Sequence, residues 1–69
     1  MNQKIKELFG TRVRERRLAL GLTQQELADR AGLHRSYIGE VELGRRNVTL
    51  ESAAKIAKVL QVDVASLLE

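Results

Sequence analysis

The stretch TQQELADRAGLHRSYIGEVE, from Thr23 to Glu42, carries the most information about the fold of this chain. Its apolar residues recur at helical spacing on both sides of Gly32, which predicts two short helices that meet there. Thr23 followed by Glu26 fits a capping box, in which each side chain bonds a free backbone N–H at a helix start. Gly32 suits the junction, because only glycine adopts a positive φ without steric cost.

The two helices divide their residues between a buried side and an exposed side. The apolar residues that we expect to pack the helices together are Leu27, Ala28, Ala31, Leu33, Ile38 and Val41. The residues that such a core does not need are His34, Arg35, Ser36, Tyr37, Gly39 and Glu40. A helix with this exposed face suits insertion into the DNA major groove, which is about 12 Å wide. The stretch therefore predicts a DNA-binding protein.

The pattern resembles the helix-turn-helix of the Cro/repressor family, also called XRE-like. With Gln24 as the first helical position, alanine is fifth, glycine ninth, isoleucine fifteenth and valine eighteenth, as in that family. The flanking segment ERRLALGLTQQELA and the later Gly44 agree as well, so the resemblance extends from about Val13 to Leu68. It implies an all-α, compact five-helix domain of the lambda-repressor-like type. We expect residues 1–69 to form this single domain, with the helix-turn-helix at about 23–42.

The segments outside this unit also predict helices. The first should run from about Gln3 to Leu20, and Gly10 inside it costs about 1 kcal/mol relative to alanine, so its first two turns should fray. Its apolar face comprises Ile5, Leu8, Phe9, Val13 and Leu20. Thr49 can cap a fourth helix and Asp63 a last short one. We expect Ala53, Ile56, Ala57 and Leu60 of the fourth helix to face inward, and the last helix contains Val64, Leu67 and Leu68.

Length and composition exclude several classes of protein. A chain of 69 residues buries only about 60% of its unfolded surface, so dimerisation would add stability. The absence of cysteine excludes disulfides and thiolate metal sites, and the lone His34 has no partners for a metal site or a catalytic triad. No apolar run approaches the roughly 20 residues that span a bilayer. We expect a cytoplasmic, nucleoid-associated protein without cofactor, metal or small-molecule effector, and not an enzyme.

The charge is unevenly distributed. The net charge is +3 and the pI about 9.8, and all eight arginines lie between Arg12 and Arg46. Because they flank the helix-turn-helix, we expect them to attract DNA phosphates, with an affinity that falls steeply as salt rises. The alternative is a solvated basic face.

Three residues of the second helix are candidates for contacts with bases. Arg35 can pair with guanine O6 and N7, or it can rest on a phosphate. Ser36 can bond a base or a phosphate. Glu40 can accept from cytosine N4, or it can form a surface ion pair with Arg35 or Arg46.

Other residues are candidates for the DNA backbone. The family resemblance places a backbone-contacting glutamine at Gln24, where a helix start also suits a phosphate. The Tyr37 hydroxyl can reach a phosphate, or its ring can pack beside the first helix. Gly39 has no side chain. Its absence can let the helix sit deep in the groove or let a thymine methyl approach, and the alternative is that it has no consequence. Arg46 and Asn47, in the segment RRNVT, resemble the loop of restriction–modification controller proteins, as does Arg35-Ser36-Tyr37-Ile38.

The resemblance assigns Arg17 and Glu42 a structural role, as an ion pair between the first helix and the end of the third. His34 departs from the family, which has serine or threonine as the cap at this position. Its imidazole can accept the cap hydrogen bond, contact a phosphate when protonated, or have no role.

The main hypothesis is a homodimeric, sequence-specific regulator of transcription on a roughly palindromic operator in double-stranded DNA. Two copies would present their DNA-contacting helices about 34 Å apart. The candidate dimer surface, whose residues alternatively close the core, comprises Val62, Val64, Ala65 and Leu68. The rival hypothesis is a protein-interaction module, such as an antitoxin or adaptor, that uses the same helical surface.

Overall fold

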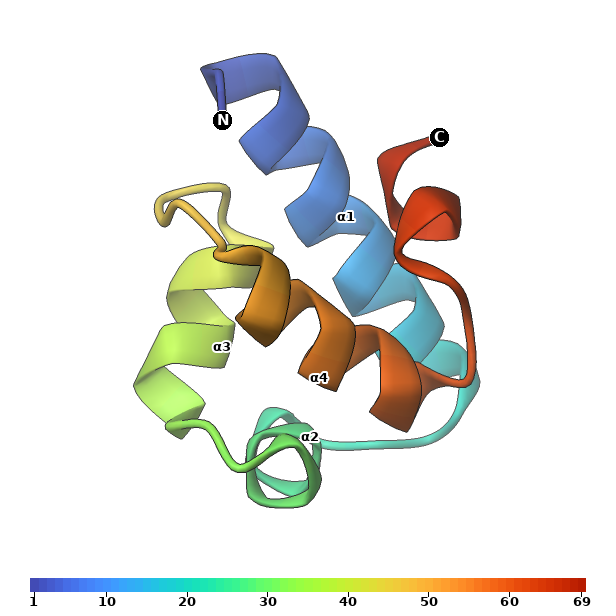
Figure 1. Cartoon of the computed structure of the whole chain (residues 1–69). Helices are drawn as coiled ribbons and strands as arrows, with labels where there is room; N and C mark the ends of the chain where they lie inside the picture. Colours follow the sequence, from blue (N-terminus) through green and yellow to red (C-terminus); the bar gives the residue numbers. More distant parts are fainter.

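The computed structural model describes all residues from Met1 to Glu69 and contains no strand. Its four α-helices are α1 (Gln3–Ala19), α2 (Gln24–Ala31), α3 (Arg35–Glu42) and α4 (Leu50–Leu60). A short 3-10 helix, η1 (Val64–Leu68), follows them. Figure 1 shows α3 and η1 on opposite sides of α1, with α4 alongside α1 and α2 across one end. The all-α prediction is confirmed, and none of the helices has the length and apolarity that crossing a bilayer requires.

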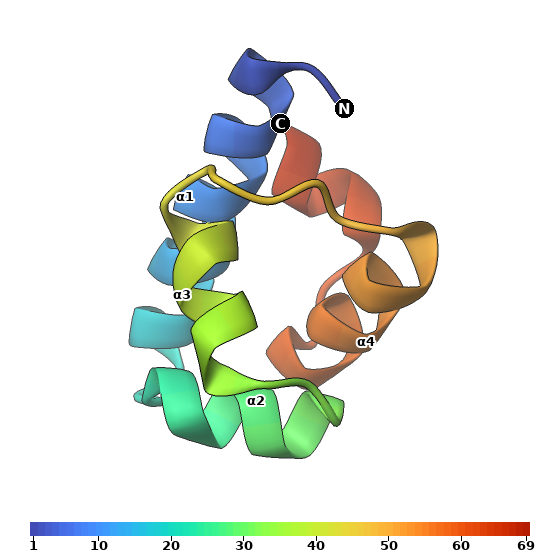
Figure 2. The same cartoon turned by 90° about the vertical axis from the view of Figure 1, so that its left-hand side faces the viewer.

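The core lies where α1, α2, α3 and α4 meet. Its largest fully buried side chains are Phe9, Val13, Leu27, Ile38, Val41, Ile56 and Leu60. These residues were all predicted to face inward, and Ala28, Ala31, Ala53 and Ala57 are buried as predicted. Leu33 and Leu20 are only partly buried. Ile5 was wrongly placed in the core: it is 40% exposed, because the first turns of α1 extend past the other helices (Figure 2).

Helix α1 passes unusually close to the end of α3 at Gly10. A Cβ atom on Gly10 would overlap the carbonyl oxygen of Val41 and lie 2.9 Å from that of Glu42. The prediction that this glycine frays the helix is wrong, since α1 is continuous from Gln3 and Gly10 is buried. The side chain of Asn2 also accepts a hydrogen bond from Ile5 N, which fixes the start of the helix. Gly10 is therefore a packing residue.

The helix-turn-helix forms as its sequence predicts. Thr23 Oγ1 accepts from Glu26 N at 3.0 Å, and a Glu26 carboxylate oxygen accepts from Thr23 N at 2.9 Å. These bonds with Thr23 hold the pKa of Glu26 below its ordinary value. Their contribution to stability is therefore present above the pKa of an unfolded glutamate and is lost as the pH falls through the lowered value. Gly32 has φ 69°, and Leu33 N donates to the Ala28 carbonyl at 2.9 Å to close α2.

The last element of the chain differs from the prediction. Thr49 caps α4 as expected, with its hydroxyl accepting from Ser52 N at 3.0 Å. The predicted fifth helix is a 3-10 turn, and the Asp63 side chain makes no capping hydrogen bond. Instead the Asp63 carbonyl accepts from Ser66 N at 3.0 Å. So short a segment favours the tighter i→i+3 bonding.

Candidate nucleic-acid interface

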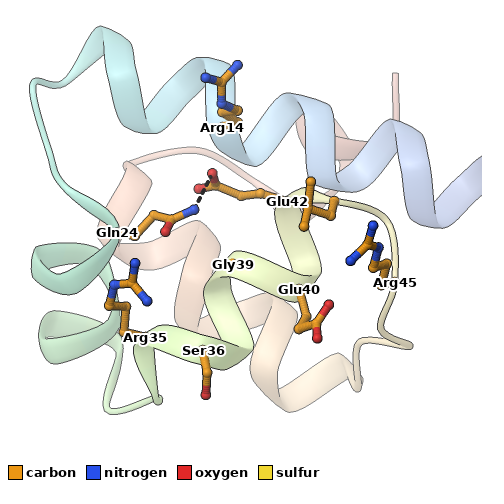
Figure 3. Close-up of a pocket in the computed structure, with 9 residues that line it drawn as sticks. Arg14, Gln24, Arg35, Ser36, Gly39, Glu40, Glu42 and Arg45 are labelled. Atoms are coloured by element: carbon orange, nitrogen blue, oxygen red, sulfur yellow. Dashed lines mark hydrogen bonds between the residues drawn. The ribbon is translucent and has the colours of Figure 1, made fainter.

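Helix α3 lies at the surface with its buried side formed by Ile38 and Val41 (Figure 2). Its opposite side borders a shallow groove, here called the α3 groove, which draws residues from α1, α2, α3 and the loop after α3 (Figure 3). The groove is lined by Arg14, Gln24, Arg35, Ser36, Gly39, Glu40, Glu42, Leu43 and Arg45. In Figure 3, Arg35 and Arg45 lie toward opposite ends of the groove, with Gly39 between them. The predicted base-contacting residues therefore share one surface.

A buried ion pair fixes the end of α3 against α1. Arg17 Nε donates to Glu42 Oε2 at 2.7 Å and its Nη2 donates to Glu42 Oε1 at 3.0 Å, the two-bond geometry that arginine favours. Arg17 Nη1 also donates to the Leu22 carbonyl at 2.8 Å. The pair that the resemblance implied is thus present, with side chains only 9% and 3% exposed. The hydrogen bond to Glu42 raises the pKa of Arg17, so the arginine stays charged at any ordinary pH.

Gln24 extends this network to the start of α2. Its Nε2 donates to Glu42 Oε1 at 3.1 Å, so one side-chain amide links the first residue of α2 to the last residue of α3 (Figure 3). The amide group lies at the edge of the α3 groove. Gln24 therefore links the two helices of the unit, and its phosphate contact stays a prediction.

Glu40 is not paired with any arginine. No salt bridge joins it to Arg35 or Arg46, so the alternative of a surface ion pair is not realised in this structure. Its Oε2 is buried without a hydrogen-bond partner. A carboxylate oxygen in this state has an unused acceptor next to the exposed side of α3.

Tyr37 and Arg46 form a second contact beside α3. The Tyr37 ring packs partly on the core, and the Arg46 guanidinium lies 5.1 Å from the ring centroid. That distance is typical of a cation–π contact. The exposed residues Arg45 and Asn47 belong to the same loop, which Gln3 anchors by donating from Nε2 to the Gly44 carbonyl at 3.1 Å. Arg46 of the loop thus lies against Tyr37 of α3.

Three of the eight arginines are engaged within the fold: Arg17, as the resemblance implied, and Arg12 and Arg16, whose bonds were not predicted. Arg12 Nε donates to the Glu69 carbonyl at 2.7 Å, and Arg16 Nε donates to the Leu60 carbonyl at 2.9 Å. Both bonds hold the C-terminal segment, and Arg17 is bound to Glu42. Sequence reasoning could not distinguish Arg12 and Arg16 from Arg14, which borders the α3 groove. The bonding partners of Arg12 and Arg16 lie far along the chain.

The remaining candidates are His34 and the residues of the candidate dimer surface. His34 precedes α3 and its side chain makes no capping hydrogen bond. Among the candidate dimer residues, Val62 and Val64 are partly buried against the core, whereas Ala65 and Leu68 are exposed. The first two thus contribute to closing the core, and the last two form an unpaired apolar edge on η1.

The comparisons with known proteins agree on one family. A family model described as helix-turn-helix matches residues 13–67. The control protein C.BamHI of Bacillus amyloliquefaciens is 43% identical, over 100% of this chain and 86% of its own length. Among solved structures, the restriction-modification controller protein C.AhdI from Aeromonas hydrophila has a TM-score of 0.87 and 47% identity, covering 90% of this chain and 94% of that one. The regulator for biofilm formation SinR, solved in complex with DNA, has a TM-score of 0.84 and 32% identity, covering 88% and 98%.

Proposed function

This chain belongs to the helix-turn-helix family whose model matches residues 13–67, and from that membership we propose that it binds one operator sequence in double-stranded DNA as a homodimer. It is a transcriptional regulator and not an enzyme. The observation that carries the proposal is the α3 groove, in which Arg35 and Ser36 stand exposed on a helix that a buried ion pair holds in place. We further propose that its target genes are those of a restriction–modification system, as the names of C.BamHI and C.AhdI suggest.

The base contacts follow from the donors and acceptors on α3. Arg35 pairs with guanine O6 and N7 through two parallel hydrogen bonds. Ser36 bonds a neighbouring base. Glu40 accepts from the N4 amino group of cytosine.

The backbone contacts surround these bases. Gln24, Tyr37, Arg46 and Asn47 bind phosphates on the two sides of α3, and Arg14 and Arg45 add positive charge at the rim of the α3 groove. Arg46 leaves the Tyr37 ring or turns on it to reach the phosphate. Because several cations face the DNA, binding releases counterions and weakens as the salt concentration rises.

The dimer places two copies of α3 in successive major grooves. Their centres are then about 34 Å apart, and the operator is a rough palindrome. The interface uses the apolar edge of η1, with Ala65 and Leu68 in contact and Val62 and Val64 supporting them from the core side. The protein acts on DNA in the nucleoid, within the cytoplasm.

Selection of bound sequences from a random duplex pool at about physiological salt tests the proposal. The wild type should enrich a palindrome with half-sites about one helical turn apart. The variant Arg35→Ala should lose about 1–3 kcal/mol of discrimination at one guanine of each half-site while keeping the other preferences.

The matched control is Arg30→Ala, because Arg30 is an exposed arginine of α2 that lies outside the α3 groove, beside Lys55 and Lys58. This variant should enrich the same palindrome as the wild type. If Arg35→Ala keeps every base preference, the assignment of Arg35 is wrong. If the wild type enriches no sequence and its binding disappears as salt rises, the proposed function itself is wrong, and a protein-interaction module becomes the better hypothesis.

A further inference from the structure

Two residues without a polar side chain, Gly39 and Leu43, lie on the exposed side of α3. Gly39 carries no side chain, and Leu43, just past the end of the helix, is 62% exposed. They are four residues apart, so they are neighbours on one face of the helix. Both line the α3 groove together with Arg35 and Ser36.

The fold does not demand glycine at position 39. A Cβ atom there would come no closer than 3.8 Å to any neighbouring atom, and the nearest atoms belong to the Gln24 side chain. Gly10 is different, since it is enclosed by backbone. Alanine is the better helix former, so Gly39 destabilises α3 without improving its packing.

The fold does not demand a leucine at position 43 either. Most of this side chain faces water beside charged groups, and it is the one apolar side chain in the α3 groove. An empty position next to an exposed leucine thus forms a small apolar site between polar side chains. In Figure 3 its Gly39 side lies between Arg35 and Arg45.

The proposed function indicates which group of the DNA would contact this site. If α3 enters the major groove, its exposed side faces base edges, and the apolar group presented there is the C5 methyl of thymine. A methyl group fits above the Cα atom of Gly39, against the Leu43 side chain. Arg35, one helical turn before Gly39, places a guanine next to that thymine.

We infer that Gly39 and Leu43 form a methyl site that recognises one thymine of each half-site, next to the guanine bound by Arg35. This inference rests on the proposed function. It makes Gly39 and Leu43 determinants of specificity in addition to the hydrogen-bonding residues.

Uracil substitution tests the methyl site directly, because uracil differs from thymine only by the missing methyl group. Each thymine of one selected half-site is replaced in turn, and the Kd of each duplex is measured by fluorescence anisotropy. At one position the wild-type protein should bind the uracil duplex roughly fourfold more weakly, the effect of burying one methyl group.

Two variants assign that preference to the site. Leu43→Ala should bind the thymine and uracil duplexes almost equally, because the apolar contact is gone. Gly39→Ala should prefer the uracil duplex, because its new methyl group occupies the space of the thymine methyl. Leu50→Ala is the matched control, since Leu50 is 87% exposed at the start of α4 and outside the α3 groove; it should keep the wild-type ratio. Circular dichroism checks that each variant is folded.

The outcomes distinguish a failure of the methyl site from a failure of the proposed function. Specific binding with equal affinity for all thymine and uracil duplexes overturns the methyl site and leaves the proposed function intact. A thymine preference that persists in both Leu43→Ala and Gly39→Ala also overturns it. Absence of any sequence-specific binding by the wild type overturns the proposed function and the methyl site together.

Discussion

Gly10→Ala should destabilise the protein by about 3 kcal/mol, the upper end of the cost of overpacking a core. The new Cβ atom would overlap the Val41 carbonyl oxygen and lie 2.9 Å from that of Glu42. Neither neighbour is a flexible side chain, so α1 and α3 must move apart. A chain of this size has a total stability of only about 3–10 kcal/mol, so the substitution would remove roughly a third or more of it. Urea denaturation followed by circular dichroism measures the loss.

Gly39→Ala is the matched control for that experiment, because it makes the same change inside another helix. Here the Cβ atom finds only ordinary contacts, at 3.8 Å or more. The gain in helix propensity should then appear alone, as an increase in stability of about 0.5–1 kcal/mol. Equal effects of the two substitutions would contradict the close approach of α1 and α3 at Gly10.

Arg17→Met should cost about 3–5 kcal/mol, because it leaves the Glu42 carboxylate buried without its cation. Only the hydrogen bond from Gln24 would still reach that carboxylate. The expected consequence for DNA is indirect: α3 loses one of its attachments to α1, and the apparent affinity falls in proportion to the folded fraction. Thermal and urea unfolding measure the loss of stability. Binding measured at saturating protein concentration shows whether the folded variant still contacts DNA.

The double variant Arg17→Met/Glu42→Leu distinguishes a stranded charge from lost packing. Replacing both partners by apolar side chains removes the uncompensated charge, so most of the lost stability should return. A double variant as unstable as Arg17→Met would show that the ion pair acts mainly through its shape and its bond to the Leu22 carbonyl.

Local signals in the sequence predicted most helix boundaries. The capping box at Thr23, the cap at Thr49 and the left-handed turn at Gly32 each depend on residues within a few positions, so the chain itself specifies them. Residue spacing carried no signal for the contacts of Gly10, Arg12 and Arg16, whose partners lie far along the chain. Gly10 meets Val41, and Arg12 and Arg16 bind carbonyls of the C-terminal segment, contacts that no spacing rule contains.

The same distinction holds for the candidate site. Helical periodicity separated the exposed residues of α3 from its buried ones, so Arg35 and Ser36 could be predicted. The pairing of Arg17 with Glu42 came from family resemblance alone, because two charges in different helices carry no local signal. Leu43 and Arg14 were missed as lining residues, since their place in the α3 groove depends on how α1 crosses α3. The spacing of Ser36, Gly39 and Leu43 on one helical face was the available signal for Leu43.

Helix α1 contacts α3 on one side and the C-terminal segment on another, and these contacts restrict changes in the length of α1. Gly10 and Arg17 are about two helical turns apart and both meet the end of α3, while Arg12 and Arg16 face the C-terminal segment. One residue inserted between Gly10 and Arg17 would rotate everything before it by about 100° relative to everything after it. Either the glycine or the ion pair would then leave α3, and an insertion between Arg12 and Arg16 would also put those two residues out of alignment. Insertions and deletions are therefore excluded from the middle of α1, whereas the loop after α3 can change length at lower cost.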